Sequence, residues 1–356
     1  HEVNKATMKK DRILSFDLLR IIAIFSMMML HVSATQFDSV PVNSASWQIF
    51  NIYDSIVRFC VPVLVMISGV FFLDPAREYP MEKLLKKNVW RLVTAYFFWS
   101  FAYAVVDAFL TYHRPGRDFL VSVIENTFTG RYHLWFVTMM IALYLLVPVL
   151  RKIAEDERLV RYFILLSFLF CYVGNLLRVL PAVGETAGIV LDKMSIVMVG
   201  GYTGYFFAGY YFYHFGICEK RKKLLYAAGI VSVLFTMAVT SLLSLKAGAA
   251  DRTFYNYLFP NNCFAAWAVF VFFKEEVSGK QWKEKEVRWI GKLSELSFGM
   301  YLVHDFINVA LKKVGLTTLS FLAVLSVPVI AALVFTASFV IILILSKIPF
   351  ARKYLM

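Results

Sequence analysis

Long apolar segments alternate with short polar ones along nearly the whole chain. Each apolar segment is close to the roughly 20 residues that an α-helix needs to cross a bilayer. The pattern therefore predicts an all-α, polytopic membrane protein with about ten transmembrane helices. The predicted spans are residues 16–36, 48–73, 91–111, 132–150, 161–180, 195–215, 224–245, 256–273, 293–311 and 318–346.

The polar segments contain no repeat, no low-complexity tract and no linker rich in Gly, Pro or Ser. We therefore expect one membrane domain over residues 16–346, an N-terminal segment at 1–15 and a tail at 347–356, with no appended soluble domain. Residues 1–7 are expected to be a vector-derived remnant in front of a native start at Met8.

Composition agrees with a lipid environment. Of the 356 residues, 60% are hydrophobic and 17% are charged, whereas a soluble domain is about a quarter charged. The net charge of +13 would suggest nucleic-acid binding in a soluble protein, but here the basic residues flank apolar runs, so we expect no nucleic-acid partner. The four cysteines, at 60, 171, 218 and 263, form no CxxC pair and predict neither a disulfide framework nor a metal site.

The Lys and Arg residues fall unevenly on the two sides of the predicted bundle. The chain has 37 Lys and Arg residues. The segments between the spans form two alternating sets. The set that includes both termini holds 26 of these residues, and the other set holds 9. Short cytoplasmic segments carry the excess of basic residues in membrane proteins. The count therefore predicts that the N- and C-termini are both cytoplasmic.

The first predicted span carries Asp17, Arg20 and His31. An ionisable group inside a span costs about 2.5 kcal/mol or more, so each needs a reason. Arg20 alone could extend to the lipid headgroups, and His31 alone could be a structural, hydrogen-bonded residue. Helix geometry places both on one face, about 16 Å apart along the axis, with Asp17 one turn before Arg20. This shared face favours a functional pair.

The second predicted span contains Asp54 and Arg58, one helical turn apart. They could neutralise each other, or Arg58 could face a polar cavity, and both interpretations stay open. Pro62 and Gly69 further along are expected to bend this helix or to allow close packing.

Other ionisable residues sit near the ends of later spans. Lys87 and Arg91 begin the third span, where they are either ordinary cytoplasmic flanks or a phosphate-binding patch. His133 and Trp135 open the fourth span, and an aromatic belt would explain Trp135 but not His133. His304, in the ninth span, is predicted to lie in the outer half, near the depth of His31.

Four motifs together resemble the acyltransferase family 3 membrane proteins. The first-helix motif is Phe16-Asp17-Leu-Leu-Arg20 followed by His31; the others are Phe59 to Gly69, His133-Leu-Trp135-Phe136, and Ser297 to His304. They occur in the family's order and cover most of the chain.

The resemblance implies a membrane-bound O-acyltransferase of the bacterial cytoplasmic (inner) membrane. It implies an acyl group taken from cytoplasmic acyl-CoA, usually acetyl-CoA, and no metal. The acceptor would be a hydroxyl of a surface polysaccharide or of its lipid-linked precursor. His31 matches the family's essential histidine and Arg20 its essential arginine. The family also tends to carry two arginines, three residues apart, in its third helix. Here Arg91 matches the second of them, and Asn88 stands at the first.

These matches assign expected roles. His31 would act as the general base or as a transient acyl carrier, because histidine can take and return a proton near neutral pH. Arg20, Arg91 and Lys87 would hold the acyl-CoA. The residues expected to shape the acceptor side are Arg58, His133, Trp135, Tyr301 and His304.

Two alternatives stay open at this stage. Some relatives carry this kind of domain beside a racemase, so the chain could transport a small polar molecule such as an amino acid. It could also be a subunit of a glycan export complex. The absence of an inverted sequence repeat disfavours the transporter. The sequence leaves homo-oligomerisation open.

Overall fold

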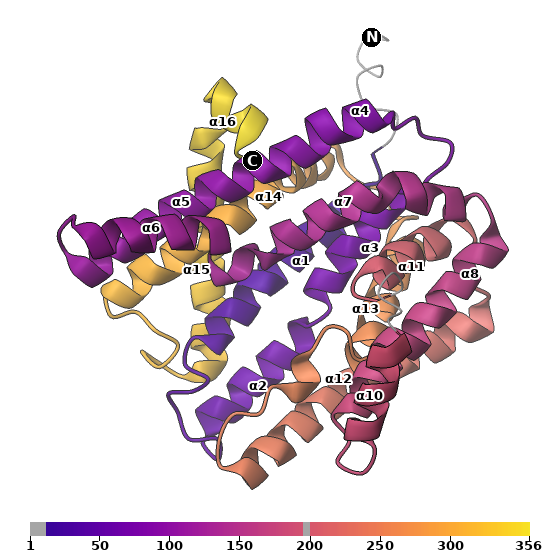
Figure 1. The fold of residues 1–356 in the computed structure, drawn as a ribbon, viewed down its shortest axis with the longest axis horizontal. Coiled ribbons are helices and arrows are strands. Elements are labelled where there is room, and N and C mark those ends of the chain that lie inside the picture. Colours follow the sequence, from indigo (N-terminus) through magenta and orange to yellow (C-terminus); the bar gives the residue numbers. More distant parts are fainter. Residues whose placement is uncertain (1–11, 195–199) are drawn as a thin grey trace.

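The computed structural model describes residues 12–194 and 200–356, and every regular element within them is helical (Figure 1). The expectation for residues 1–7 lies outside the described residues, as does the start of the predicted span 195–215. The α-helices are α1 (Leu14–Ala34), α2 (Ala45–Val57), α3 (Cys60–Phe72), α4 (Met81–Lys83), α5 (Trp90–Tyr112), α6 (Arg117–Thr129), α7 (Trp135–Ala154), α8 (Glu157–Leu166), α9 (Gly174–Arg178), α10 (Gly184–Met194), α11 (Thr203–His214), α12 (Glu219–Ala247), α13 (Pro260–Phe272), α14 (Glu284–Lys313), α15 (Ala323–Leu345) and α16 (Pro349–Tyr354). Short 3-10 or π segments are η1 (Leu84–Val89), η2 (Tyr132–Leu134), η3 (Ser167–Val173), η4 (Thr253–Tyr255) and η5 (Phe273–Val277).

Each predicted span coincides with one of these helices or with two in series. In the described part of the chain, seven helical stretches are long and apolar enough to cross a membrane, which identifies a multi-pass membrane protein. The other three predicted spans fall on α11 and α13, which are only 12 and 13 residues long, and on α14, which is long but more polar. Ten spans, and the orientation of the termini, stay predictions.

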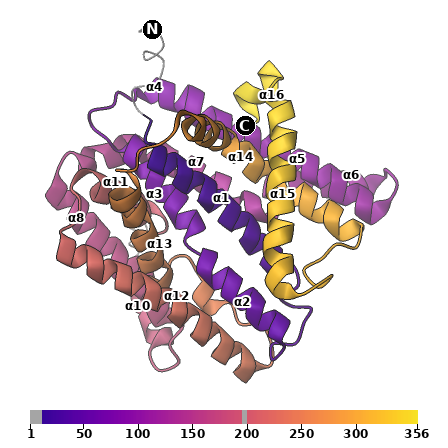
Figure 2. The ribbon, with the colours of Figure 1, turned by 180° about the vertical axis from the view of Figure 1, so that it is seen from behind.

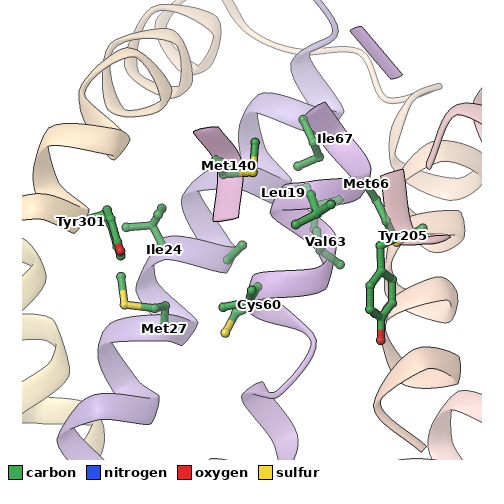
Figure 3. Packing of buried hydrophobic residues seen from close by; sticks show 14 of the residues in the cluster. Leu19, Ile24, Met27, Cys60, Val63, Met66, Ile67, Met140, Tyr205 and Tyr301 are labelled. Atoms are coloured by element: carbon green, nitrogen blue, oxygen red, sulfur yellow. The ribbon is translucent and has the colours of Figure 1, made fainter. Parts of the chain in front are cut away.

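Helix α1 lies at the centre of the bundle. It packs against α2, α3, α14 and α15 (Figures 1 and 2). Its buried face carries Ile24 and Met27, which point toward Tyr301 of α14 (Figure 3). On the other side of the core, Met66 of α3 lies beside Tyr205 of α11 (Figure 3). The polar residues of α1 are therefore held inside protein rather than against lipid.

The second predicted span is two helices, α2 and α3, separated at Arg58 and Phe59. Pro62 accounts for the break, because it has no backbone N–H to offer the carbonyl of Arg58 and its ring crowds that carbonyl. The interruption leaves Arg58 at the junction of two helices, inside the bundle. Arg58 and Phe59 keep right-handed helical backbone angles, so the break is a local loss of helix hydrogen bonding, which membrane proteins tolerate where protein surrounds the backbone.

Helices α3 and α11 make the closest backbone approach in the core. A Cβ added at Gly69 would stand 1.9 Å from the carbonyl oxygen of Phe206, and one at Gly209 would stand 2.1 Å from that of Met66. Both contacts are far inside van der Waals range, so only glycine fits at either position. Small residues at helix contacts are the usual device for close packing in membranes.

Gly69→Ala is expected to lower the free energy of unfolding by about 1–3 kcal/mol, because the new methyl group would force α3 and α11 apart. The measurement is the thermal unfolding midpoint of the purified protein in detergent. Gly279→Ala is the matched control, since an added Cβ there meets no atom within 4 Å. Equal midpoints for the two variants would contradict the packing argument.

The connecting segment predicted at residues 111–131 contains helix α6, which packs along α5 (Figure 1). Phe119 and Val123, four residues apart, form a small buried cluster with Ala104 and Ala108 of α5. The C-terminal α16 is tied to the same helix, because Thr94 and the Trp99 indole donate hydrogen bonds to the carbonyls of Tyr354 and Leu355. Helix α5 is thereby fixed along its length.

Candidate active site

Arg20 is anchored within a small polar network between α1 and α14. Its guanidinium donates to Asp17 at 2.9 Å and to the Ser294 hydroxyl at 2.7 Å. Ser294 donates to Asp17 at 2.6 Å, and Arg12 also pairs with this carboxylate. The pairing of Asp17 and Arg20 one turn apart agrees with the sequence prediction. Because Arg20 shares Asp17 with Arg12, the cluster keeps a net positive charge.

Arg20 and Arg91 line one cavity, here named the Arg20 cavity, with a volume of about 290 Å³. Arg91 is exposed, and its guanidinium carbon lies 6.0 Å from the centre of the Phe298 ring. Lys87 is exposed on η1 and is not among the lining residues. The rest of the lining is mixed: apolar and aromatic side chains, Tyr301 among them, stand beside three serines and Glu295, which pairs with Arg352. Two of the three cations predicted to bind acyl-CoA therefore face the same space.

The three histidines singled out in the sequence form one ring cluster with Tyr301. The rings of His31 and His304 stack, with centroids 5.2 Å apart and planes 24° from parallel. His133 stands edge-on to His304 at 4.8 Å and to Tyr301 at 5.7 Å. The Tyr301 hydroxyl donates to the carbonyl of His133. Sequence depth predicted His304 near His31, and the fold places them in contact.

The hydrogen bond of His304 defines its tautomer. Its Nδ1 lies 2.6 Å from the carbonyl oxygen of Tyr301, which can only accept, so Nδ1 carries the proton. In the neutral ring, Nε2 then keeps a free lone pair, and this atom is buried without a hydrogen-bond partner. Both ring nitrogens of His133 are also buried and unpartnered within the described structure. Buried polar atoms without partners in a cluster of this kind are typical of a site completed by a ligand.

A second cavity, the His31 cavity, also meets the ring cluster and has a volume of about 360 Å³. His31 and Tyr132 line it, and their rings meet edge to face at 5.3 Å. Its other polar lining residues are Thr35, Gln36, Arg131, Asp305, Asn308, Lys312, Thr317 and Thr318. The ring cluster thus meets both cavities, since Tyr301 lines the Arg20 cavity and His31 lines this one.

Asp305 organises the polar side of the His31 cavity. It accepts from Arg131 at 2.8 Å and from the Tyr132 hydroxyl at 2.9 Å, and Arg131 also pairs with Asp107. Sequence analysis did not single out Arg131, Tyr132 or Asp305 for this site. The available signal was their adjacency in sequence to His133 and His304.

Arg58 and Trp135 belong to a separate cluster. Arg58 pairs with Asp54 and lies over the rings of Tyr255, at 4.2 Å, and Tyr257, at 5.5 Å. Trp135 stacks near the same Tyr257 ring at 6.1 Å. Arg58 also lines a cavity of about 550 Å³. Both open interpretations of Arg58 therefore hold, since it is paired with a carboxylate and faces a polar cavity.

Tyr255 and Tyr257 were not predicted as site residues, because they fall between α12 and α13 rather than within a recognised motif. Burial raises the pKa of the Tyr255 phenol. It therefore stays a hydroxyl and donates to the Asn51 side chain at 2.6 Å. This bond joins the connecting segment to α2, next to the Arg58 junction.

In residues 12–194 and 200–356, no group of three or more His, Cys, Asp and Glu side chains is arranged to hold a metal ion. The chain matches a family model described as an acyltransferase domain, and the match covers residues 13–347. A search of the curated proteins and a search of the solved structures each gave no match.

Proposed function

This chain belongs to the acyltransferase family, and we propose that it moves an acyl group, acetyl in the first instance, from cytoplasmic acyl-CoA to a hydroxyl of a surface glycan. The acceptor would be the polysaccharide itself or its lipid-linked precursor, and the location the bacterial inner membrane. The observation that carries the proposal is His31, stacked on His304 in a ring cluster that meets two cavities, one lined by two arginines and the other by His31 with several hydrogen-bonding side chains.

The Arg20 cavity suits the donor. Acyl-CoA joins an anionic nucleotide head to a long, nearly neutral pantetheine arm that ends in the thioester. Exposed Arg91 can meet the phosphates, because guanidinium groups bind phosphate oxygens with charge-assisted hydrogen bonds. Arg20 lies deeper, held by Asp17 and Ser294, where it would meet the arm. The apolar and aromatic side chains of the lining would then lead the thioester toward Tyr301 and the ring cluster.

The ring cluster suits the chemistry. As the acceptor hydroxyl oxygen attacks the thioester carbonyl, the His31 imidazole would take its proton. Collapse of the tetrahedral intermediate would break the carbon–sulfur bond and release the CoA thiolate, which receives that proton from His31. His304 lines neither cavity, and its ring, stacked on His31, would hold the His31 imidazole in position. A transient acyl group on His31 stays the alternative route.

The His31 cavity suits a polyhydroxylated acceptor. Its lining combines a carboxylate, a guanidinium, two amides and several hydroxyls, groups that hydrogen-bond sugar hydroxyls in either direction. The Tyr132 ring beside His31 adds an apolar face against which a sugar ring can pack. By the charge count this cavity is predicted to open on the external side, where surface glycans are assembled.

The test is acyl transfer by the purified protein in proteoliposomes. We expect release of CoA thiol from acetyl-CoA that depends on an added oligosaccharide mixture prepared from surface glycan, and transfer of labelled acetyl to that mixture. The proposal would be overturned if thiol release did not depend on the added oligosaccharide and no glycan became labelled. Uptake of labelled amino acid into the vesicles, without thiol release, would support the transporter instead. Activity of the isolated chain would exclude a purely structural export subunit.

Asp305→Asn is expected to raise the KM for the glycan acceptor about tenfold, while the KM for acetyl-CoA stays unchanged. The substitution keeps the shape but removes the charge, which weakens a hydrogen bond to an ionised group by roughly 1.5–3 kcal/mol. Asp107→Asn is the matched control, because Asp107 pairs with the same Arg131 but does not line the cavity. Equal changes in the two variants would assign Asp305 to holding Arg131 rather than to the acceptor.

A further inference from the structure

A large cavity, here named the α12 cavity, lies away from the candidate active site. It has a volume of about 1050 Å³ and is lined by α8, α11, α12 and α13 with the segments that join them. Neither Arg20, Arg91 nor any residue of the ring cluster lines it. The proposed acyl-transfer reaction therefore does not account for this space.

The lining of the α12 cavity joins cations to an apolar wall. The cations are Arg161, Arg221 and Lys274. Arg161 pairs with Glu157, and Lys274 pairs with Glu275 at 2.6 Å. Arg221 is exposed and makes no ion pair with any residue that the structure describes. Three cations and one acidic residue, Glu275, line the cavity. The lining is therefore positively charged, and an anion is the complementary ligand.

The apolar wall contains an unused hydrogen-bond donor. Trp267 lines the cavity among aromatic rings, with Phe212 at 5.6 Å and Phe264 at 6.0 Å. Its indole Nε1 is buried without a hydrogen-bond partner in the described structure. An indole N–H normally finds an acceptor when it is buried. An ester or phosphate oxygen entering the cavity would supply one.

The cavity also borders the bilayer. Leu224 of α12 lines it and is 70% exposed, and Leu234 and Leu242 further along the same helix are exposed as well. In a membrane, this surface faces acyl chains. The three cations belong to the segments that the charge count predicts to be cytoplasmic. Basic pockets between transmembrane helices on that side are suited to anionic lipid headgroups.

We propose that the α12 cavity binds one anionic phospholipid of the predicted cytoplasmic leaflet. The phosphodiester lies among Arg161, Arg221 and Lys274, and an acyl chain lies along the aromatic wall past Trp267. A soluble phosphate would use the cations but leave the apolar wall empty. A neutral lipid would use the wall but leave Arg221 without a partner.

The test is native mass spectrometry of the full chain in detergent, titrated with phosphatidylglycerol and, separately, with phosphatidylcholine. We expect one phosphatidylglycerol bound at least about fivefold more tightly than phosphatidylcholine. Arg221→Gln/Lys274→Gln should remove this preference, and Trp267→Phe should weaken binding of both lipids while leaving the preference in place. Lys220→Gln/Lys223→Gln is the matched control, because it removes the same charge at exposed positions outside the lining.

Three results would overturn the proposal. Equal loss of phosphatidylglycerol binding in the control and in Arg221→Gln/Lys274→Gln would show that binding depends on general surface charge. Equal affinity of the wild type for both lipids would show no headgroup site. Displacement of phosphatidylglycerol by inorganic phosphate at the same concentration would show a site for a soluble anion. Each variant is first checked for an unchanged thermal unfolding midpoint, and Arg221→Gln alone, at an exposed position, is the fallback if the double variant does not fold.

Discussion

Replacing His31 by alanine should reduce acyl transfer by about 10²–10⁴-fold, the range that a positioned general base contributes. His31 is the one histidine of the ring cluster that lines the His31 cavity, the proposed acceptor side, so neither His133 nor His304 can take its place beside a bound hydroxyl. The measurement is kcat for thiol release from acetyl-CoA at saturating acceptor. The KM for acetyl-CoA should change little, because His31 does not line the Arg20 cavity.

His113→Ala is the matched control for this experiment, because His113 is an exposed histidine outside the ring cluster. It should keep wild-type turnover. A folded His31→Ala protein with wild-type turnover would contradict the catalytic role. Incubation with labelled acetyl-CoA, without acceptor, separates the two routes for His31. If the wild-type protein carries label after an acid quench and His31→Ala does not, His31 is an acyl carrier. If neither protein carries label, His31 acts as a base.

Loss of Arg20 should raise the KM for acetyl-CoA by roughly 10–100-fold, which corresponds to one charge-assisted hydrogen bond. Arg91→Ala should have a smaller effect in the same direction, because Arg91 is exposed and screened by solvent. Arg20→Ala should also lower stability, since Asp17 and Ser294 lose a hydrogen-bond partner. Arg91→Ala therefore tests donor binding without that complication.

Lys86→Ala is the matched control for the donor side. Lys86 is an exposed cation in the same part of the chain, paired with Glu82 at 2.6 Å and not part of the cavity lining. The KM of Lys86→Ala for acetyl-CoA should equal that of the wild type. The KM of Lys87→Ala shows whether Lys87, the remaining predicted cation, takes part in donor binding. A KM for acetyl-CoA unchanged in both Arg20→Ala and Arg91→Ala would remove the Arg20 cavity as the donor site.

Regular helix geometry made part of the site predictable. The eleven-residue interval between Arg20 and His31 predicts one face of α1, and in the structure both residues contact α14, through Ser294 and His304. The depth of His304 followed from its distance along a predicted span. These inferences succeed because an α-helix has a fixed rise and turn per residue.

Contacts between helices were not predictable in the same way. The residues predicted on the acceptor side fall into two groups that the sequence does not distinguish, because His133 joins the ring cluster whereas the Trp135 ring meets Tyr257, which also lies under Arg58. Asp305 and Arg131 pair across α14 and the start of η2, and nothing in either segment alone specifies that pairing. Pro62 was expected to bend the second predicted span, but the sequence did not show that the chain would divide into two helices at Arg58 and Phe59.

The ring cluster, which meets both cavities, has an electrical consequence. If water fills both cavities, most of the membrane voltage falls across this thin layer, where moving one elementary charge costs about 2.3 kcal/mol per 100 mV. An acetyl group is uncharged and does no electrical work in passing from the Tyr301 side to the His31 side. The nucleotide of CoA carries several negative charges, so moving it across the same layer would involve much more electrical work. On the alternative route, with a transient acyl group on His31, a small neutral group would then cross beside the stacked His31 and His304 rings while the membrane voltage is preserved.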